Sequence, residues 1–436
     1  MKLPLSHSQI DELISFIEIP SFDQISINEI GYLINNIEKK ANDNVIRMHM
    51  GIPGLEISSI LVKEELNAIT SKVNQQYPST KGIPELKKEV SNFAKLFMNL
   101  NLQPKYCFPT NGAIFGFFLS LMVAGRCKKE RDTILFIDPG FSVHKQTAKI
   151  LGLKYKSFDI YKYRGEKLKD KLESYLKEGD IFGILYSNPN NPTWICLNDK
   201  ELESIAHLAN EYDVTVFEDL AYFGMDFRYD YSIPGKAPFQ PTIASYTDNY
   251  IIYISCSKAF SYPGPRIGLM LVSDKIYESE HPDLKKYYNS SHFGYSLVDE
   301  TIYSTTYGVA HSAQHALTGL LKKINSGEYN FIHTLKSYGE KAKRIKKLFL
   351  SNGFELVYKD ENDDNIADGF YFTLSYKNYS GIELCKELLR YGISVTSLHL
   401  TGSLRKEAIR VCVSLVNDDD LEIIESRIQL FNKKNS

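Results

Sequence analysis

The segment YISCSKAFSYPGPRIG, Tyr253–Gly268, places a lysine at the point where an apolar strand ends. The β-branched and aromatic residues up to position 254 predict a buried strand. Two serines and Lys258 follow at once, and Arg266 comes eight residues later behind a Pro-Gly-Pro turn. Lysine is rarely buried without a partner. Either the segment is a solvated loop, or the lysine holds a ligand covalently and the arginine neutralises part of that ligand.

The composition limits the class of protein. The chain has 436 residues, a net charge of −2, 43% hydrophobic residues and 24% charged residues, as is ordinary for globular proteins. This length suggests roughly two or three domains. The near-zero charge provides no basic surface for nucleic acid. The longest apolar stretch, 114–125, is too short to span a bilayer, and the acidic, weakly apolar N-terminal residues do not resemble a signal peptide.

The six cysteines are scattered along the chain, with no Cys-x-x-Cys pair and no neighbouring histidine cluster. That pattern favours buried free thiols over a disulfide framework or a metal site. We therefore expect a cytoplasmic protein that contacts neither membrane nor nucleic acid and holds no metal.

Short β-rich runs alternate with helical patterns through the first part of the chain, as in TILFIDPG, IFGILYSNPN and VTVFEDLAYF. The segment LNDKELESIAHLANEY predicts an amphipathic helix capped by Asn198 or Asp199. Strands that alternate with helices predict an α/β core with a mostly parallel sheet. After about residue 312 the pattern changes to long helices followed by short strands. We expect a large α/β domain over 53–315 and a smaller α+β domain built from 1–52 and 316–436.

Polar and aromatic residues follow the predicted strands. Ligands of open parallel sheets bind beyond the carboxyl ends of the strands, so these residues are expected to share one crevice. Polar residues at any single strand end are ordinary, but polar or aromatic residues at five strand ends favour a ligand-binding site. The candidates are Asn111, Gly112 and Ala113; Phe141; Asn191; Asp219 and Tyr222; and Ser255, Ser257 and Lys258.

The chemistry of these groups suggests a phosphorylated, carbonyl-bearing ligand. A glycine at a helix start leaves backbone N–H groups open to an anion, and Arg266 adds a bidentate cation. Asp219 ends an apolar strand, and a buried carboxylate needs a positive or donating partner. A desolvated lysine can attack a carbonyl. Phosphate anchor, carboxylate, aromatic ring and amine together match the requirements of pyridoxal 5′-phosphate.

In its ordered motifs the chain resembles the class I/II aminotransferases, which are fold-type I pyridoxal 5′-phosphate enzymes. The resemblance implies a large domain with a mixed, mostly parallel seven-stranded sheet. It covers most of the chain, and the Ser-x-Ser-Lys segment with its Pro-Gly-x-Arg-x-Gly tail is its most specific part. The matching stretches are YPSTKGIPELKKEV, PTNGA, DPGF, SNPNNPT, EDLAYF, SCSKAFSYPGPRIG and AIRVCVS.

The resemblance implies a role for each candidate. Lys258 would form the Schiff base and transfer the proton. Asp219 would pair with the pyridine nitrogen, Asn191 and Tyr222 would bind the ring oxygen, and Phe141 would stack on the ring. The expected phosphate ligands are Asn111, Gly112, Ala113, Ser255, Ser257 and Arg266. Arg410 would bind the substrate carboxylate with Asn191, and Gly51 would belong to the segment that closes over substrate. Tyr77 would reach the phosphate of the other subunit of a homodimer.

Two departures from the family pattern concern the substrate side. The family usually has glycine after Asn-Pro-Thr, and this chain has Trp194, its only tryptophan. No arginine occurs from Ile267 through Lys343, a region where family members that take dicarboxylic acids often carry one. His49, His144 and His292 are interpreted as packed or exposed side chains rather than ligands.

Three functions remain open from the sequence. The first is transamination between an amino acid and a 2-oxo acid. The second keeps the cofactor but changes the outcome, as in carbon–sulfur lyases, aminocyclopropane-type synthases and amino-acid oxidases, because fold does not determine chemistry. The third is a non-catalytic ligand sensor, which the near-zero charge and the short N-terminal segment disfavour.

Overall fold

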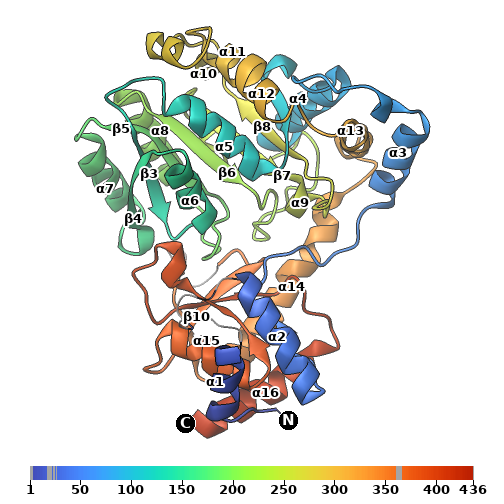
Figure 1. Ribbon diagram of the computed structural model, residues 1–436, viewed down its shortest axis with the longest axis vertical. Coiled ribbons are helices and arrows are strands. Elements are labelled where there is room, and N and C mark those ends of the chain that lie inside the picture. The colour runs from blue at the N-terminus through green and yellow to red at the C-terminus, as the bar shows by residue number, and fades with distance from the viewer. Residues whose placement is uncertain (1–2, 17–21, 23–24, 26, 360–365, 436) are drawn as a thin grey trace. The chain divides into compact units, whose positions relative to one another are not determined.

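The computed structural model describes residues 3–16, 22, 25, 27–359 and 366–435. The chain forms two compact units (Figure 1): a large unit of 55–191 and 196–335, and a smaller unit of 1–54, 192–195 and 336–436. The boundary expected at 315/316 lies inside helix α13 (His311–Asn325). The units divide instead at 335/336, within α14 (Phe331–Leu350). Because α14 is continuous, its sequence pattern does not mark the division.

The large unit contains most of the elements. Its strands are β2 (Cys107–Thr110), β3 (Thr133–Asp138), β4 (Lys154–Asp159), β5 (Ile181–Ser187), β6 (Thr215–Leu220), β7 (Tyr250–Ser255) and β8 (Gly268–Val272). Its helices are α3 (Ser59–Thr70), α4 (Pro84–Met98), α5 (Ala113–Ala124), α6 (Ser142–Ile150), α7 (Glu166–Leu176), α8 (Asp199–Glu211), α9 (Cys256–Ala259), α10 (Asp274–Tyr277), α11 (Phe293–Tyr295), α12 (Tyr303–Thr305) and α13. The 3₁₀ turns are η2 (Val73–Gln75), η3 (Pro104–Tyr106), η4 (Ile160–Lys162), η5 (Ile243–Ser245) and η6 (Pro282–Lys286), and η7 (Ser296–Ile302) is a π-helix.

One sheet of seven strands organises the large unit, in the order β2-β8-β7-β6-β5-β3-β4. The pairs from β7 to β4 are parallel, while β8 runs antiparallel to both of its neighbours. This mixed, mostly parallel sheet with connecting helices confirms the expected α/β fold. The carboxyl ends of β5, β6 and β7 therefore meet at one edge.

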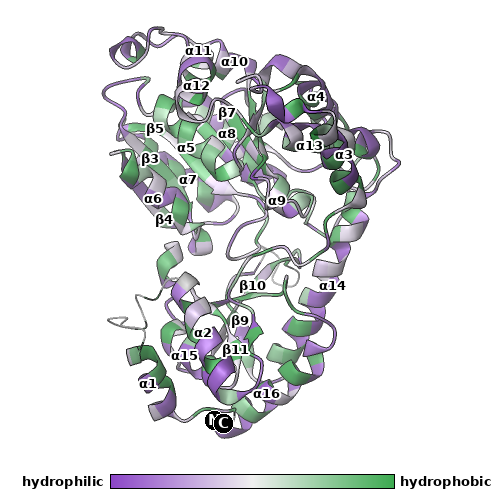
Figure 2. Cartoon of the chain, turned by 45° about the vertical axis from the view of Figure 1, so that its right-hand side comes forward, coloured by the Kyte–Doolittle hydropathy of each residue, from purple (hydrophilic) through white to green (hydrophobic). Residues whose placement is uncertain are grey.

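The hydrophobic core explains why these segments form these elements. Strands β3, β5 and β7 are almost continuously apolar, as expected for strands covered on both faces. Helix α5 is apolar nearly all round (Figure 2), and its side chains pack against those of the sheet and of 293–302. Helices buried on this scale are held by tertiary packing rather than by propensity.

Helix α8 forms as its sequence predicts. Asn198 caps it by accepting from the Glu201 backbone N–H at 3.0 Å, and the Glu201 side chain accepts from Asn198 N in return. This reciprocal capping box satisfies two donors at the helix start. The apolar face expected from the spacing, Leu202, Ile205, Leu208 and Ala209, is fully buried.

The smaller unit has an α+β arrangement of its own. Its elements are α1 (His7–Phe16), α2 (Ile27–Ala41), β1 (Ile46–Arg47), β9 (Phe354–Leu356), β10 (Tyr371–Tyr376), α15 (Gly381–Arg390), β11 (Ile393–Ser394), β12 (Thr396–Ser397), η8 (Leu398–Thr401), β13 (Ile409–Cys412), α16 (Asp420–Asn435) and the greater part of α14. An antiparallel sheet has the order β12-β13-β10-β9, and β1 pairs with β11 in parallel. A separate aromatic and aliphatic core fills this unit.

Within the described residues, none of the helices has the length and apolar character that crossing a bilayer requires. The six cysteines are free thiols; five are buried as expected, and Cys127 is partly exposed.

Candidate functional site

The strand register brings several of the predicted residues to one edge of the large unit's sheet. Ser187 pairs with Asp219 across β5 and β6, and Asp219 pairs with Tyr253 across β6 and β7. Ser255, at the end of β7, is opposite Gly268 of β8. Since β2 also pairs with β8 through Gly268, the start of α5 lies beside the end of β7.

Arg266 lies against the start of α5. Its Nη1 donates to the Ser257 hydroxyl at 3.3 Å and to the Pro263 carbonyl at 2.9 Å. A Cβ placed on Gly112 would lie 2.6 Å from Arg266 Nη2, and Gly112 has a φ of 81°. Only glycine allows both this backbone conformation and this close approach. The guanidinium, a hydroxyl and a helix N-terminus therefore meet at one point, which is the composition of a phosphate site.

Close packing against β8 also fixes the main chain at the start of α5. A Cβ on Gly268 would lie 2.5 Å from the backbone N of Ala113. Asn111 is half-buried between the strand and the helix. The backbone N–H groups at the start of α5 are therefore held in place by β8, without bulky side chains over them.

Asp219 is a buried carboxyl at the end of β6. It is 9% exposed and accepts a hydrogen bond from Ala221 N at 3.0 Å. Burial raises the pKa of Asp219 to about 7. A cationic ring nitrogen placed against this carboxyl would remove that penalty and lower its pKa again. Asp219 therefore fits the pyridine nitrogen of the cofactor.

His144 lies beside Asp219, with Nε2 3.7 Å from Asp219 Oδ2. Its side chain is 5% exposed, and burial lowers its pKa to about 4. The rings of Phe117 and Phe141 meet it edge-on at 4.8 and 5.6 Å. Of the two settings expected for His144, packed or exposed, the structure shows the packed one. Its contact with Asp219 was not foreseen, because it depends on where α6 places its first turn.

Lys258 lies in α9, the single turn of helix that follows β7. It is half-buried, and its neighbours Cys256, Ser257 and Ala259 are buried. Lys258 is therefore not a fully solvated loop residue. Lys258 belongs to the same strand end as Ser255 and Ser257.

Asn191 and Tyr222 are also buried near this edge, 9% and 3% exposed. The backbone N of Asn191 donates to the Ser187 hydroxyl at 3.3 Å, and Asn190 donates to the Pro139 carbonyl at 2.9 Å. Tyr222 lies in the turn after β6. These bonds attach the Asn191 loop to the ends of β5 and β3.

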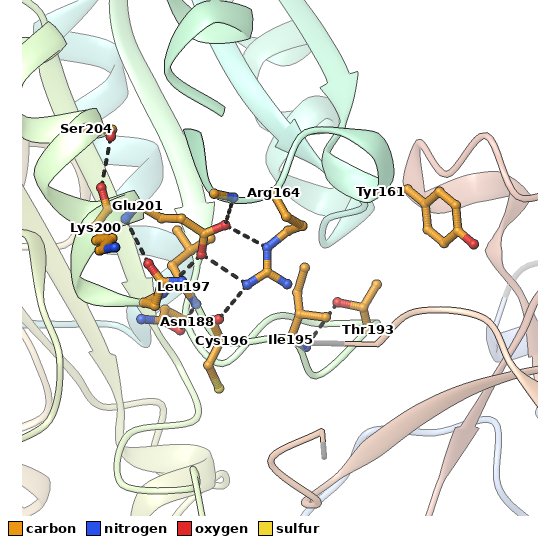
Figure 3. Close-up of polar contacts among 12 residues, drawn as sticks. Tyr161, Arg164, Asn188, Thr193, Ile195, Cys196, Leu197, Lys200, Glu201 and Ser204 are labelled. Carbon is orange, nitrogen blue, oxygen red and sulfur yellow. Dashed lines mark hydrogen bonds and ion pairs between the residues drawn. The ribbon is translucent and has the colours of Figure 1, made fainter. Parts of the chain in front are cut away.

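An ion pair holds the far end of that loop (Figure 3). Arg164 Nε and Nη2 donate to the two carboxylate oxygens of Glu201 at 2.7 and 3.0 Å, and Nη2 also donates to the Cys196 carbonyl at 3.1 Å. Glu201 is fully buried and accepts further bonds from the backbone N–H groups of Gly165 and Asn198. A carboxylate with four donors is well compensated for its burial. The sequence pattern did not predict this pair, although Glu201 is the third residue of α8, the position that completes a capping box with Asn198.

Arg410 is a buried residue of β13 in the smaller unit, 6% exposed. Its Nη2 donates to the His49 carbonyl at 2.6 Å, and its guanidinium carbon lies 4.5 Å from the centre of the Tyr371 ring. Arg410 is therefore not a surface side chain. A Cβ on Gly51 would lie 1.8 Å from the Tyr371 hydroxyl, so the Gly51 segment also depends on glycine here.

His49 is packed, as expected, and is 0% exposed. Its Nδ1 lies 2.8 Å from the Ser394 hydroxyl, which itself donates to the Ile46 carbonyl at 3.1 Å. The ring must therefore donate through Nδ1. Burial and the charges of Arg47 and Arg410 lower the pKa of His49 to about 3. His292 is partly exposed and pairs with Glu278 at 3.1 Å.

Tyr77 is not enclosed at the strand-end site of its own chain. Its side chain is 83% exposed and its ring contacts that of Tyr307 at 4.9 Å. Trp194, in contrast, is fully buried and belongs to the smaller unit. No set of three or more metal-binding side chains is arranged to hold an ion within the described part of the chain.

Comparisons with known proteins agree with this geometry. A family model described as aminotransferase class I and II matches residues 44–428. The chain is 22% identical over 357 residues to the probable aspartate aminotransferase of Methanocaldococcus jannaschii, covering 82% of this chain and 85% of that protein. It is 28% identical to the histidinol-phosphate aminotransferase of Methanococcus aeolicus, over 84% and 86% of the two chains. The crystal structure of Thermotoga maritima aspartate aminotransferase superposes with a TM-score of 0.74 at 17% identity, covering 99% and 100%.

Proposed function

The chain belongs to the class I and II aminotransferase family, and from that premise we propose that Lys258 carries the cofactor and transfers the proton. The enzyme is a pyridoxal 5′-phosphate-dependent aminotransferase that moves an amino group between an amino acid and a 2-oxo acid. When bound, the cofactor supplies an aldehyde that bonds to an amine and a ring that withdraws electrons from the substrate Cα. The observation that carries the proposal is that the strand end with Lys258 lies beside Asp219 of the neighbouring strand and beside Arg266, whose guanidinium contacts Ser257.

Arg266 and the start of α5 are the proposed phosphate site. The guanidinium offers fixed donors, and Gly112 lets that guanidinium approach the start of α5 more closely than a Cβ would allow. The remaining proposed phosphate ligands are Asn111, Ala113, Ser255 and Ser257. These donors lie between β2 and the first residue of α5, at the end of β7, in α9 and in the turn before β8. Because these elements are packed together, the donors are fixed before any ligand arrives.

Asp219 is proposed to hold the proton of the ring nitrogen. Its burial makes the carboxylate costly unless a cation faces it, and neutral His144 beside it adds no competing charge. Asn191 and Tyr222 would donate to the ring oxygen. Phe141, which meets His144 edge-on, would cover the ring face.

Lys258 is proposed to act as the general base that takes the proton from the substrate Cα and holds it for return. An amine tethered at the end of a rigid strand would be held near that carbon, which is how a general base gains its advantage. Its half-buried setting limits access of water to the proton in transit.

Arg410 is proposed to bind the substrate α-carboxylate, with Asn191 and the Gly51 segment as further substrate contacts. The His49 carbonyl and the Tyr371 ring fix its guanidinium, as bidentate recognition of a carboxylate requires. The absence of arginine from residues 267–343 supports an amino acid whose side chain carries no second carboxylate.

We also propose a homodimer in which Tyr77 reaches the cofactor of the partner subunit. Val62, Leu66 and Ile69 form an exposed apolar stripe along α3 at helical spacing, and Tyr77 is more exposed still. Exposed apolar surface of this kind often marks a protein interface. The six free thiols support a cytoplasmic location.

A spectral screen tests the proposed function. Holoenzyme is mixed with each common amino acid, and the visible band of the lysine-bound cofactor is followed. We expect the band to decay with at least one donor and to return when a 2-oxo acid is added. Lys258→Ala should lack the band. Release of ammonia or thiol with no acceptor present would contradict transamination and favour a lyase.

A further inference from the structure

Trp194 occupies a strained and buried position. Its φ is 63°, in the left-handed region that residues other than glycine rarely adopt, yet its side chain is 0% exposed. Strain of this kind persists only where the surroundings over-determine the conformation. Here the burial of a large aromatic side chain supplies the compensation. The chain therefore keeps an indole where glycine would be the relaxed choice.

The surroundings of Trp194 are shaped for the indole. Its ring stacks on Phe370 at 6.2 Å with an interplanar angle of 14°, and meets Tyr371 edge-on at 5.7 Å. A Cβ on Gly369 would lie 2.1 Å from Cζ2 of Trp194. The residue that leads into β10 must therefore be glycine for the indole to fit. Phe370 is in turn held by Tyr338, whose ring centre lies 4.5 Å away.

Tyr371 links this cluster to Arg410. The Arg410 guanidinium carbon lies 4.5 Å from the centre of the Tyr371 ring, within range of a cation–π interaction. The hydroxyl of the same residue lies against Gly51, at the place where a Cβ would be. Tyr371 thus has Trp194 at its ring, Arg410 over it and Gly51 at its hydroxyl. A ring bounded in this way has little freedom to move.

We propose that Trp194 is a positioning residue for the substrate carboxylate: it fixes the ring of Tyr371, and that ring fixes the guanidinium of Arg410. The proposal rests on the proposed role of Arg410 in substrate binding. Removal of the indole opens a cavity beside Tyr371, the ring gains freedom, and the guanidinium loses its support on one face. The His49 carbonyl still accepts from Nη2, so Arg410 is loosened rather than released. A more mobile guanidinium binds the substrate carboxylate less tightly and leaves the chemical step unchanged.

The test compares two substrates of the holoenzyme: the amino acid that reacts best in the spectral screen, and the amine that lacks its carboxylate. The ratio of their kcat/KM values measures carboxylate recognition. Trp194→Gly should lower this ratio about tenfold, equivalent to about 1.4 kcal/mol, mainly through a higher KM for the amino acid. Tyr371→Leu should act similarly, and Trp194→Phe should restore part of the loss.

Phe349→Leu is the matched control. Phe349 is a fully buried aromatic residue of the same unit that packs on Phe354 and Phe372 instead. It should lower the melting temperature and leave the ratio unchanged. If Trp194→Gly does not fold, Trp194→Phe and Tyr371→Leu still decide the question.

Arg410→Ala distinguishes the proposed substrate-binding role of Arg410 from the positioning role of Trp194. Should it abolish the preference for the amino acid while Trp194→Gly and Tyr371→Leu leave that preference intact, the positioning role is wrong and the proposed function stands. Equal losses for amino acid and amine in the Trp194 variants would also overturn the positioning role, since they would indicate general damage. If Arg410→Ala itself leaves the ratio unchanged, the assignment of the carboxylate site is wrong.

Discussion

Replacement of Asp219 by asparagine should stabilise the cofactor-free protein and weaken the cofactor-bound one. In the structure the Asp219 carboxyl is 9% exposed, and its pKa is raised from 3.8 to about 7 because burial disfavours the charge. That change corresponds to about 4 kcal/mol, since one pKa unit is worth about 1.36 kcal/mol. Asparagine has a similar shape and cannot ionise, so it removes this cost.

The raised pKa of Asp219 determines how the free energy of unfolding changes with pH. Below about pH 3.8 the carboxyl is protonated in both the folded and the unfolded chain and costs nothing. Between that pH and about 7 the unfolded chain releases its proton first, so the folded state loses stability as the pH rises. Above about pH 7 the cost is complete. The stability difference between Asp219→Asn and wild type should therefore grow from pH 4 to pH 7 and then level off.

Urea unfolding of both apo-proteins from pH 4 to pH 9 measures this difference. Glu218 is a second buried carboxyl, whose pKa is raised to about 7 chiefly by burial and in smaller part by the charge of Asp219. It is present in both proteins, so the burial contribution cancels in the comparison. With the cofactor bound, a cation should face Asp219, so the order of stability should reverse. An apo difference that does not change with pH, or a variant less stable than wild type at pH 8, would refute the reasoning.

Three further substitutions probe the loop and the two ligand sites. Arg164→Met leaves the buried Glu201 carboxylate without its cation and should lower the free energy of unfolding by about 3–5 kcal/mol in urea. The double variant with Glu201→Gln should recover part of this loss. Equal losses in the single and the double variant would contradict the coupling between the two residues. Arg266→Lys loses the fork that faces Gly112 and should raise the cofactor Kd about tenfold or more in equilibrium dialysis; an unchanged Kd would remove Arg266 from the phosphate site. Gly51→Ala places a Cβ against the Tyr371 hydroxyl. It should lower the free energy of unfolding by about 1–3 kcal/mol and raise the KM for the amino acid. An unchanged melting temperature would contradict the close contact between Gly51 and Tyr371.

Local signals in the sequence predicted much of the large unit. The helix after Asn198 formed as expected because the residues that cap it and the residues of its apolar face all lie within the helix segment itself. The apolar run before Ser255 predicted the end of β7, and the run before Asp219 predicted the end of β6 to within one residue, since β6 continues to Leu220. Strand β8 could not be placed in the same way, because its antiparallel position between β2 and β7 depends on pairings with distant residues.

The smaller unit shows where local reasoning ends. Strands β1 and β11 are two residues each, and they pair across more than three hundred positions. The assignment of 192–195 to this unit follows from the burial of Trp194 against Phe370, which no nearby residue signals. The contact of His144 with Asp219 likewise depends on the packing of α6 rather than on spacing.

The central claim is that Lys258 is the amine that carries the cofactor. Treatment of holoenzyme with borohydride makes a lysine–cofactor bond permanent, and mass analysis of the digested protein then locates it. The account predicts the added mass on the peptide that contains Lys258, with none in a Lys258→Ala protein. The same mass on any other lysine, or unmodified Lys258 in protein that retains the cofactor, would contradict it.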